Sequence, residues 1–153
     1  MNDEQFLKQA IELSKESVAI GGYPVGALIV KGDKVISTGF SDGKQLCDPT
    51  SHAETSAIRV AGQVLQKRNL DDVVLYTSHE PCVMCFMSSF WGYIPKVVFA
   101  CSHAKSPTMY NEGDHDTFEL NKKNRRHIEL IHFTELEDEA LKVITDWEEG
   151  KNK

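Results

Sequence analysis

Long apolar runs are missing from this sequence of 153 residues. Its segments stay well short of the roughly 18 consecutive apolar residues that a membrane-spanning helix needs. A secretory leader is not indicated either, because the chain opens with Met1-Asn2-Asp3-Glu4, which is acidic and starts an amphipathic pattern. We therefore expect a protein that has no membrane partner and that works in the cytoplasm.

Cysteine is scarce, with four residues in the whole chain. Four cysteines in a chain of this length do not make a disulfide framework. Cys82 and Cys85 form a Cys-x-x-Cys pair, which outside the secretory pathway indicates a metal site or a redox site. The cysteine pattern therefore points to chemistry at this pair.

An excess of positive charge is also missing. The chain has 17 Lys and Arg against 23 Asp and Glu, which gives a net charge of −6 and a pI near 5.5. Such a surface repels a polyanion over most of its area, so we expect nucleic acid to be an unlikely partner. The one basic run, at 122–127, is more simply a solvated loop before a strand than an RNA contact.

The length and the apolar content, 41%, fit a single domain over residues 1–153. Apolar residues recur at helical spacing, or follow helix-start signals, at 3–20, from 51 onward, at 81–91 and at 135–147. Short apolar or alternating runs predict strands at 25–30, 34–40, 70–77, 96–101 and 127–133, with a loop at 41–50 and an irregular segment with one short helix at 102–126. This order predicts an α/β fold of three layers, α/β/α, with a five-stranded mixed sheet covered by helices on both faces.

Two of the predicted helix starts carry metal-ligating residues. His52 stands at the first, and Cys82 and Cys85 follow Pro81 at the second. Two thiols three residues apart at a helix start can face one point, where the helix dipole favours thiolates. One imidazole and two thiolates suit zinc and leave a fourth tetrahedral position for water, as in catalytic sites. We expect one Zn²⁺ per chain at these three residues.

Glu54 is the predicted catalytic residue, because it lies two positions after His52 and would not share its helix face. Two thiolates nearly neutralise the metal and weaken its effect on the pKa of water. A carboxylate that accepts the proton from the water, and later delivers it to the substrate, compensates for this. Glu54 is therefore interpreted as a proton shuttle and not as a fourth ligand.

Each feature also has a simpler interpretation. Ser51 and Glu54 fit a capping box, in which Glu54 only binds a backbone N–H. Cys82 and Cys85 alone could be a redox pair of thioredoxin type. The combination of His-x-Glu with Pro-Cys-x-x-Cys some thirty residues later nevertheless matches the zinc deaminase signature.

The motifs together resemble the cytidine deaminase superfamily, and within it the branch of guanine deaminases, free cytosine deaminases and tRNA adenosine deaminases. The resemblance covers about residues 4 to 105 and is carried by segments 24–30, 48–54 and 75–85. It implies the three-layer fold, the hydrolytic replacement of an exocyclic amino group by oxygen with release of ammonia, and assembly as a homodimer. A cluster of aromatic residues near one helix would be buried in that dimer: Phe86, Phe90, Trp91 and Tyr93.

The same resemblance implies substrate contacts. The backbone N–H groups of Ala53 and Cys82 would help to hold the substrate or the attacking hydroxide. We also expect substrate contacts from Pro24 and Val25. Trp91 is expected to wall the pocket, although an aromatic residue at a helix end is equally often a core or dimer contact.

One position departs from the family pattern. The asparagine that the family commonly has after the second strand is replaced by Ser41, which is followed by Asp42. These two residues are expected to read a ring edge that presents N–H donors, which makes guanine the first candidate substrate. The alternatives are a cytosine or nucleoside deaminase, a tRNA-specific adenosine deaminase, and a zinc module without catalytic function. The presence of Glu54 argues against the last.

Overall fold

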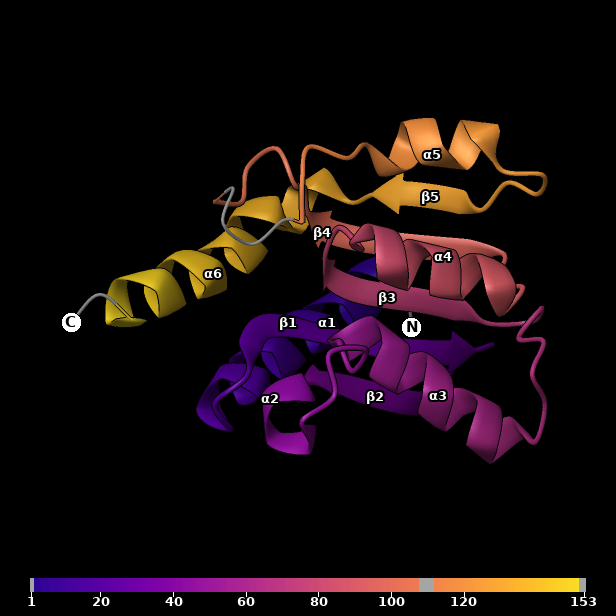
Figure 1. Ribbon diagram of the computed structural model, residues 1–153, viewed down its shortest axis with the longest axis horizontal. Helices are drawn as coiled ribbons and strands as arrows, with labels where there is room; N and C mark the ends of the chain where they lie inside the picture. The colour runs from indigo at the N-terminus through magenta and orange to yellow at the C-terminus, as the bar shows by residue number, and fades with distance from the viewer. Residues whose placement is uncertain (1, 108–111, 152–153) are drawn as a thin grey trace.

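The computed structural model of the protein describes residues 2–107 and 112–151 (Figure 1). Five strands form one mixed sheet in the order β2-β1-β3-β4-β5. β1 pairs antiparallel with β2 and β3, whereas β3, β4 and β5 pair in parallel. This confirms the predicted five-stranded mixed sheet; the strands are β1 (Tyr23–Lys31), β2 (Lys34–Ser41), β3 (Val74–His79), β4 (Lys96–Cys101) and β5 (Glu129–His132).

Helices cover both faces of the sheet, as predicted. One apolar layer joins α1 (Asp3–Ala19) and α6 (Glu137–Lys151) to the sheet, and the opposite layer joins α3 (Ala53–Leu65) and α4 (Val83–Trp91) to it. Figure 1 shows α3 and α4 in front of the strands and α1 behind them. Successive side chains of β1 alternate between the layers, with Leu28 in the first and Ile29 in the second.

Two glycines permit close helix–sheet contact. A Cβ atom at Gly39 in β2 would lie 2.0 Å from the carbonyl oxygen of Ala53, and one at Gly26 in β1 would lie 2.4 Å from the backbone nitrogen of Ser14. The first turn of α3 therefore rests directly on β2, and α1 rests directly on β1. The contact at Gly39 fixes the height of the predicted site residues above the sheet.

The ends of three strands share one edge of the sheet. β2 and β3 both run opposite to β1, and β4 is parallel to β3, so these three strands end on the same side, at Ser41, His79 and Cys101. α4 follows the end of β3 after three residues, and α3 follows β2 after the short helix α2 (Gly43–Leu46). Both predicted helix starts thus lie at the carboxyl edge, where open α/β sheets bind ligands.

The strand predicted at 70–77 begins only at Val74. Asp71 and Asp72 form a turn before it, and their carboxylates pair with Lys67, while Asp72 also pairs with Lys31. The first part of the predicted strand is therefore a turn. The ion pairs of Asp71 and Asp72 with lysines hold these two residues in the turn.

The remaining segments differ in smaller ways. The loop predicted at 41–50 holds α2, whose four residues are too few to show a periodicity. The last helix continues past its predicted end and is preceded by the 3-10 turn η2 (Thr134–Leu136). The irregular segment holds α5 (Thr117–Lys123), and its residues 108–111 lie outside the described residues. Within the described ranges, none of the helices has the length and apolar character to cross a bilayer.

Candidate active site

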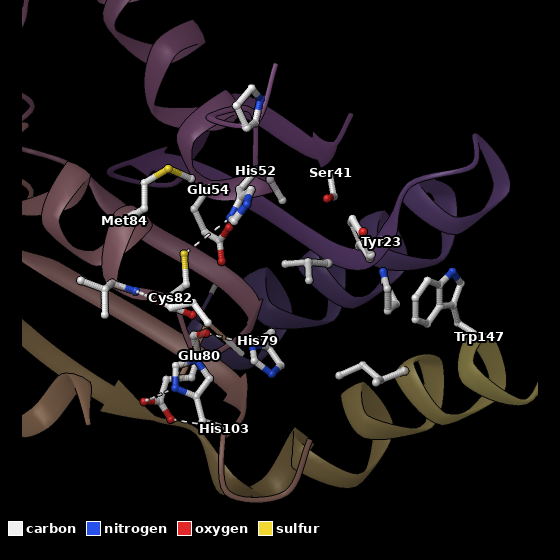
Figure 2. A pocket seen from close by; sticks show the side chains of 17 residues that line it. Tyr23, Ser41, His52, Glu54, His79, Glu80, Cys82, Met84, His103 and Trp147 are labelled. Carbon is white, nitrogen blue, oxygen red and sulfur yellow. Dashed lines mark hydrogen bonds and ion pairs between the residues drawn. The ribbon is translucent and has the colours of Figure 1, made fainter. Parts of the chain in front are cut away.

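The three predicted metal ligands converge on one point. His52 is the residue before the first turn of α3, Cys82 holds the same place at α4, and Cys85 lies in the first turn of α4. Nδ1 of His52 lies 3.5 Å from Sγ of Cys82 and 3.4 Å from Sγ of Cys85, and the three atoms all lie within 4.8 Å of one another. Two helix starts that are far apart in the sequence therefore present one ligand cluster (Figure 2).

This cluster has the dimensions of a zinc site. Tetrahedral zinc with Zn–N and Zn–S bonds of about 2.1 and 2.3 Å separates nitrogen from sulfur by about 3.6 Å. The two His52–Cys distances match that separation. Three ligands also leave one tetrahedral position for water or substrate, as in catalytic zinc sites.

The protonation of the two thiols also suits a cation. A hydrogen bond between the cysteines, together with the neighbouring His52 imidazole, lowers the pKa of Cys82 to about 4. The same hydrogen bond and burial raise the pKa of Cys85 well above its usual range. The pair thus holds a single proton, which a divalent cation displaces when both sulfurs become ligands.

Glu54 lies in the first turn of α3, beside the ligand cluster. Glu54 is only 4% exposed, and its Oε1 accepts a hydrogen bond from the hydroxyl of Thr77 at 3.2 Å. Burial, and after it the charge on Cys82, raises the pKa of this carboxyl. A buried carboxyl with a raised pKa beside a metal site is suited to accepting and returning a proton.

The capping interpretation of Glu54 does not hold. The hydroxyl of Ser51 donates to Asp42 at 2.6 Å and so does not form the expected box. The backbone N–H of His52 instead donates to Thr55 at 2.9 Å. Glu54 is therefore not the residue that closes the start of α3, and its burial needs another explanation.

A cavity of about 710 Å³ opens from the ligand cluster. Six of the predicted residues line it together with Cys82: Pro24, Val25, Ser41, His52, Ala53 and Glu54. They come from the start of β1, the end of β2 and the start of α3, which all lie at the carboxyl edge or beside it. The fold thus gathers these side chains around the cluster.

Two residues predicted to contact substrate are placed elsewhere. The carboxylate of Asp42 accepts the hydroxyl proton of Ser51 and supports the chain that leads into α3, outside the cavity lining. Trp91 is 61% exposed at the last turn of α4, where it packs edge-on against Phe90. The opposite end of α4 faces the cavity, so Trp91 does not wall it.

A buried polar network that was not predicted from the sequence borders the cavity at His79, Glu80 and His103. The carboxylate of Glu80 accepts hydrogen bonds from the hydroxyl of Thr117 and the backbone N–H of His103, whose Nδ1 lies 3.3 Å from Oε2. The ring of His79 bonds the Glu80 carbonyl through Nδ1 and Ser106 through Nε2. The position of Glu80 beside the Cys motif was a signal, whereas His103 and Ser106 had none.

Three further lining residues had no clear sequence signal. Glu112 accepts the backbone N–H of Val83 at 2.7 Å, at the start of α4. Partial burial opposes its charge, yet this hydrogen bond and two nearby histidines keep its pKa below the ordinary value. Tyr23 and Trp147 line the cavity at the end away from Cys82 (Figure 2).

The basic run at 122–127 is partly structural. The guanidinium of Arg126 lies over the rings of Phe90 and Tyr93, at 4.5 and 4.3 Å from their centroids, and donates to the Phe90 carbonyl. Lys122 pairs with Glu119 at 2.7 Å. Two of its cations are therefore engaged within the protein.

The chain is similar in sequence to known deaminases. The sequence profile of the cytidine and deoxycytidylate deaminase zinc-binding region matches residues 1–101. A guanine deaminase of Bacillus subtilis (strain 168) is 46% identical over 104 residues, which are 67% of this chain and 67% of that protein. A tRNA-specific adenosine deaminase of Aquifex aeolicus (strain VF5) is 37% identical over 120 residues, or 76% of this chain and 80% of that protein.

A solved structure agrees over nearly the whole length. The X-ray structure of guanine deaminase from Bacillus subtilis superposes with a TM-score of 0.69 and 36% identity, covering 97% of this chain and 95% of that chain. The presence of tRNA-specific enzymes among the relatives overturns the exclusion of nucleic acid as a partner. Net charge is too coarse a quantity for that exclusion, since one local surface suffices to bind an RNA hairpin.

Proposed function

The chain belongs to the cytidine and deoxycytidylate deaminase family of zinc-dependent hydrolases, and we propose that its own substrate is a free aminated purine, with guanine as the first candidate. The observation that carries this proposal is the 46% identity to a guanine deaminase through the segment that holds the site. The reaction replaces the amino group by oxygen and releases ammonia.

The residues of the site divide the reaction between them. His52, Cys82 and Cys85 would hold zinc, which supplies a Lewis acid that lowers the pKa of water. Glu54 accepts one proton of the attacking water as the new C–O bond forms, and it delivers a proton to the amino group as the C–N bond breaks. The hydroxyl of Thr77 holds its carboxylate in place. One water is consumed for each ammonia released.

The walls of the cavity favour a ring with several N–H donors. Glu80 and Glu112 line the cavity, and their carboxylates are hydrogen-bond acceptors. Guanine offers N1–H in addition to its amino group, whereas the same edge of adenine presents an acceptor.

Deamination of adenosine in tRNA is the second candidate. The relatives that are named tRNA-specific adenosine deaminases favour it, and one of them aligns over 80% of its own length. Such an enzyme would need an open path to the cavity for a hairpin and cations around it. The exposed acids Asp138 and Glu139 in the first turn of α6 weigh against that surface.

The experiment that decides is a substrate panel. Ammonia release is measured for guanine, cytosine, adenine, their nucleosides and a tRNA anticodon hairpin with the zinc-loaded protein. Turnover of guanine with little or none of the hairpin supports the proposal, whereas turnover of the hairpin alone overturns it. Ser41→Asn, which restores the family residue inside the cavity, should change the preference among bases, and Asp42→Asn, outside the cavity, is the matched control.

Three further features belong to this proposal. We propose that the chain acts as one deaminase domain over residues 1–153, and that it forms a homodimer through exposed apolar side chains of α3 and α4, among them Val64 and Trp91. Light scattering at micromolar concentration tests the dimer. We also propose a cytoplasmic location, because metal-binding thiols are kept reduced there.

A further inference from the structure

The cavity has a larger volume than a single base requires. A purine has about the bulk of five water molecules, or about 150 Å³ at about 30 Å³ per water. The cavity measures about 710 Å³. Figure 2 shows His52, Glu54 and Cys82 grouped at one end and Trp147 at the other. A base whose amino-bearing carbon lies at the metal ligands therefore leaves the far end of the cavity open.

Two aromatic rings define that far end. Tyr23 begins β1 and Trp147 lies in α6, and their ring centroids are 5.6 Å apart with the planes at 57°. Tyr23 remains 55% exposed in spite of this contact. Pro24 and Val25 continue the lining from Tyr23 toward the zinc ligands. The aromatic pair is thus part of the wall of the same cavity, at the end that the reacting ring leaves open.

The buried core of α6 consists of residues other than Trp147. α6 is held in the fold by Ala140, Val143 and Ile144, which are buried in the layer shared with α1. Trp147 lies one turn beyond Ile144 and lines the cavity, and Ile144 also reaches the lining. Large rings at a cavity mouth leave π faces on which a flat group can stack.

The charges near Trp147 favour an uncharged group. Trp147 also borders a neighbouring groove in which the lysines Lys15, Lys44 and Lys142 are interspersed with the acids Glu139 and Asp146. Lys142 and Asp146 pair at 2.6 Å. Lys15 likewise pairs with Glu12 at 2.6 Å, so acids offset two of the three lysines, and the following Glu148 and Glu149 add negative charge.

We propose that Tyr23 and Trp147 form an aromatic subsite for a flat, uncharged extension of the substrate, carried on the side of the ring away from its amino group. This inference rests on the proposed function, since it assumes a small heterocycle with its amino carbon at the zinc ligands. The enzyme then binds an aryl-substituted or further-fused aminated heterocycle more tightly than the bare base. Stacking on one aromatic residue is worth roughly 5- to 100-fold in affinity.

The chain supplies its own probe, because it has two tryptophans. In Trp91→Phe the only indole is Trp147, at the cavity; in Trp147→Phe the only indole is Trp91, which is 61% exposed outside it. Fluorescence is titrated with guanine, 9-benzylguanine and 8-phenylguanine. At least one aryl derivative should quench Trp91→Phe at a concentration at least 5-fold below guanine, and should leave Trp147→Phe unchanged. Equal affinity of guanine and both derivatives overturns the subsite.

Kinetics give a second, independent measurement. Trp147→Leu and Tyr23→Ala should each raise KM for the aryl derivative at least 5-fold more than they raise KM for the bare base. If Trp147→Leu fails to fold, Tyr23→Ala and the milder Trp147→Phe carry the test. Equal effects on both substrates overturn the subsite.

The two proposals fail in different ways. Turnover of guanine without preferential quenching by either aryl derivative refutes the subsite and leaves the proposed function standing. Preferential quenching without turnover of any free base supports the subsite and refutes the proposed function. Quenching of Trp147 by the tRNA hairpin but by neither aryl derivative assigns the pair to RNA and overturns the subsite for small extensions.

Discussion

The hydroxyl of Thr77 lies 3.2 Å from Oε1 of Glu54 and 3.1 Å from the carbonyl oxygen of His79. A residue of the sheet therefore orients the carboxylate that we propose as the proton shuttle. We expect Thr77→Val, which keeps the shape and removes the hydroxyl, to lower kcat about 10-fold, the worth of one hydrogen bond to a charged group. Thr77→Ser should stay within about 2-fold of wild type, and equal losses in both variants would assign the effect to packing.

Glu54→Gln separates the proton shuttle from the metal site. The amide keeps the size of the side chain and can still accept from Thr77, but it cannot take a proton from water. The expected result is a loss of about 10²- to 10⁴-fold in kcat with unchanged zinc content and melting temperature. Steady-state ammonia release and metal analysis on the same sample measure it; near-normal turnover would remove Glu54 from the mechanism.

The zinc ligands can be tested by metal content alone. Cys82→Ala and Cys85→Ala should each fall from about one zinc per chain to well below half after dialysis, because two ligands do not make a stable site. Cys47→Ala is the matched control, since Cys47 is an exposed thiol outside the cluster and should retain the metal. Full occupancy in either ligand variant would place the site elsewhere.

The buried ring of His79 makes stability depend on pH. Burial, followed by the neighbouring His103, lowers the pKa of His79 to about 4, whereas the unfolded chain binds the proton near 6.5. The unfolded state then holds more protons between these values, so stability is complete above about pH 6.5 and falls as the pH drops toward 4. The loss is on the order of 3 kcal/mol.

Urea unfolding at pH 7.5 and pH 5 should show about 2 kcal/mol of this loss, and His79→Gln is the comparison. The variant should show a smaller loss between the two pH values than wild type, because it lacks the titrating ring. Weakening of the metal site in acid affects both proteins and cancels in the difference. An identical pH dependence would show that other groups control acid stability.

Arg126 should stabilise the fold through the rings of Phe90 and Tyr93. Its guanidinium contacts both ring faces and a backbone carbonyl, so Arg126→Ala is expected to cost about 1–2 kcal/mol in the free energy of unfolding. Arg125→Ala, at an exposed neighbour, should change it by less than about 0.5 kcal/mol. Equal changes, measured by urea unfolding, would show that the stacked geometry contributes nothing.

The ligand cluster could be predicted because its members are set by local features. His52, Cys82 and Cys85 stand at helix starts, and a helix start fixes where its first residues point. The layers and the sheet followed from apolar periodicity in the same way, since each element shows its own buried face. Chemistry confined to two short motifs is readable without knowledge of the packing.

The end of the cavity away from Cys82 could not be predicted, because it is formed by elements that are distant in the sequence. Tyr23 and Trp147 come together only because α6 packs beside α1 on the face opposite α3. Trp91 was misplaced because periodicity does not tell which end of a helix faces a cavity. Asp42 was predicted to contact substrate, but its carboxylate accepts a hydrogen bond from Ser51 instead. Sequence spacing does not show which of these partners a carboxylate binds.

The metal ligands and Glu54 lie on different elements from the residues at the other parts of the cavity, and this separation has a consequence for how such a protein evolves new specificities. The groups proposed to carry out the reaction lie at the starts of α3 and α4, whereas Tyr23, Ser41 and Trp147 lie on other elements. Replacements at these three positions can therefore exchange one substrate for another without disturbing the reaction. A small library randomised at Tyr23, Ser41 and Trp147, selected on a nitrogen source that only deamination releases, would sample new specificities while every member retains the metal.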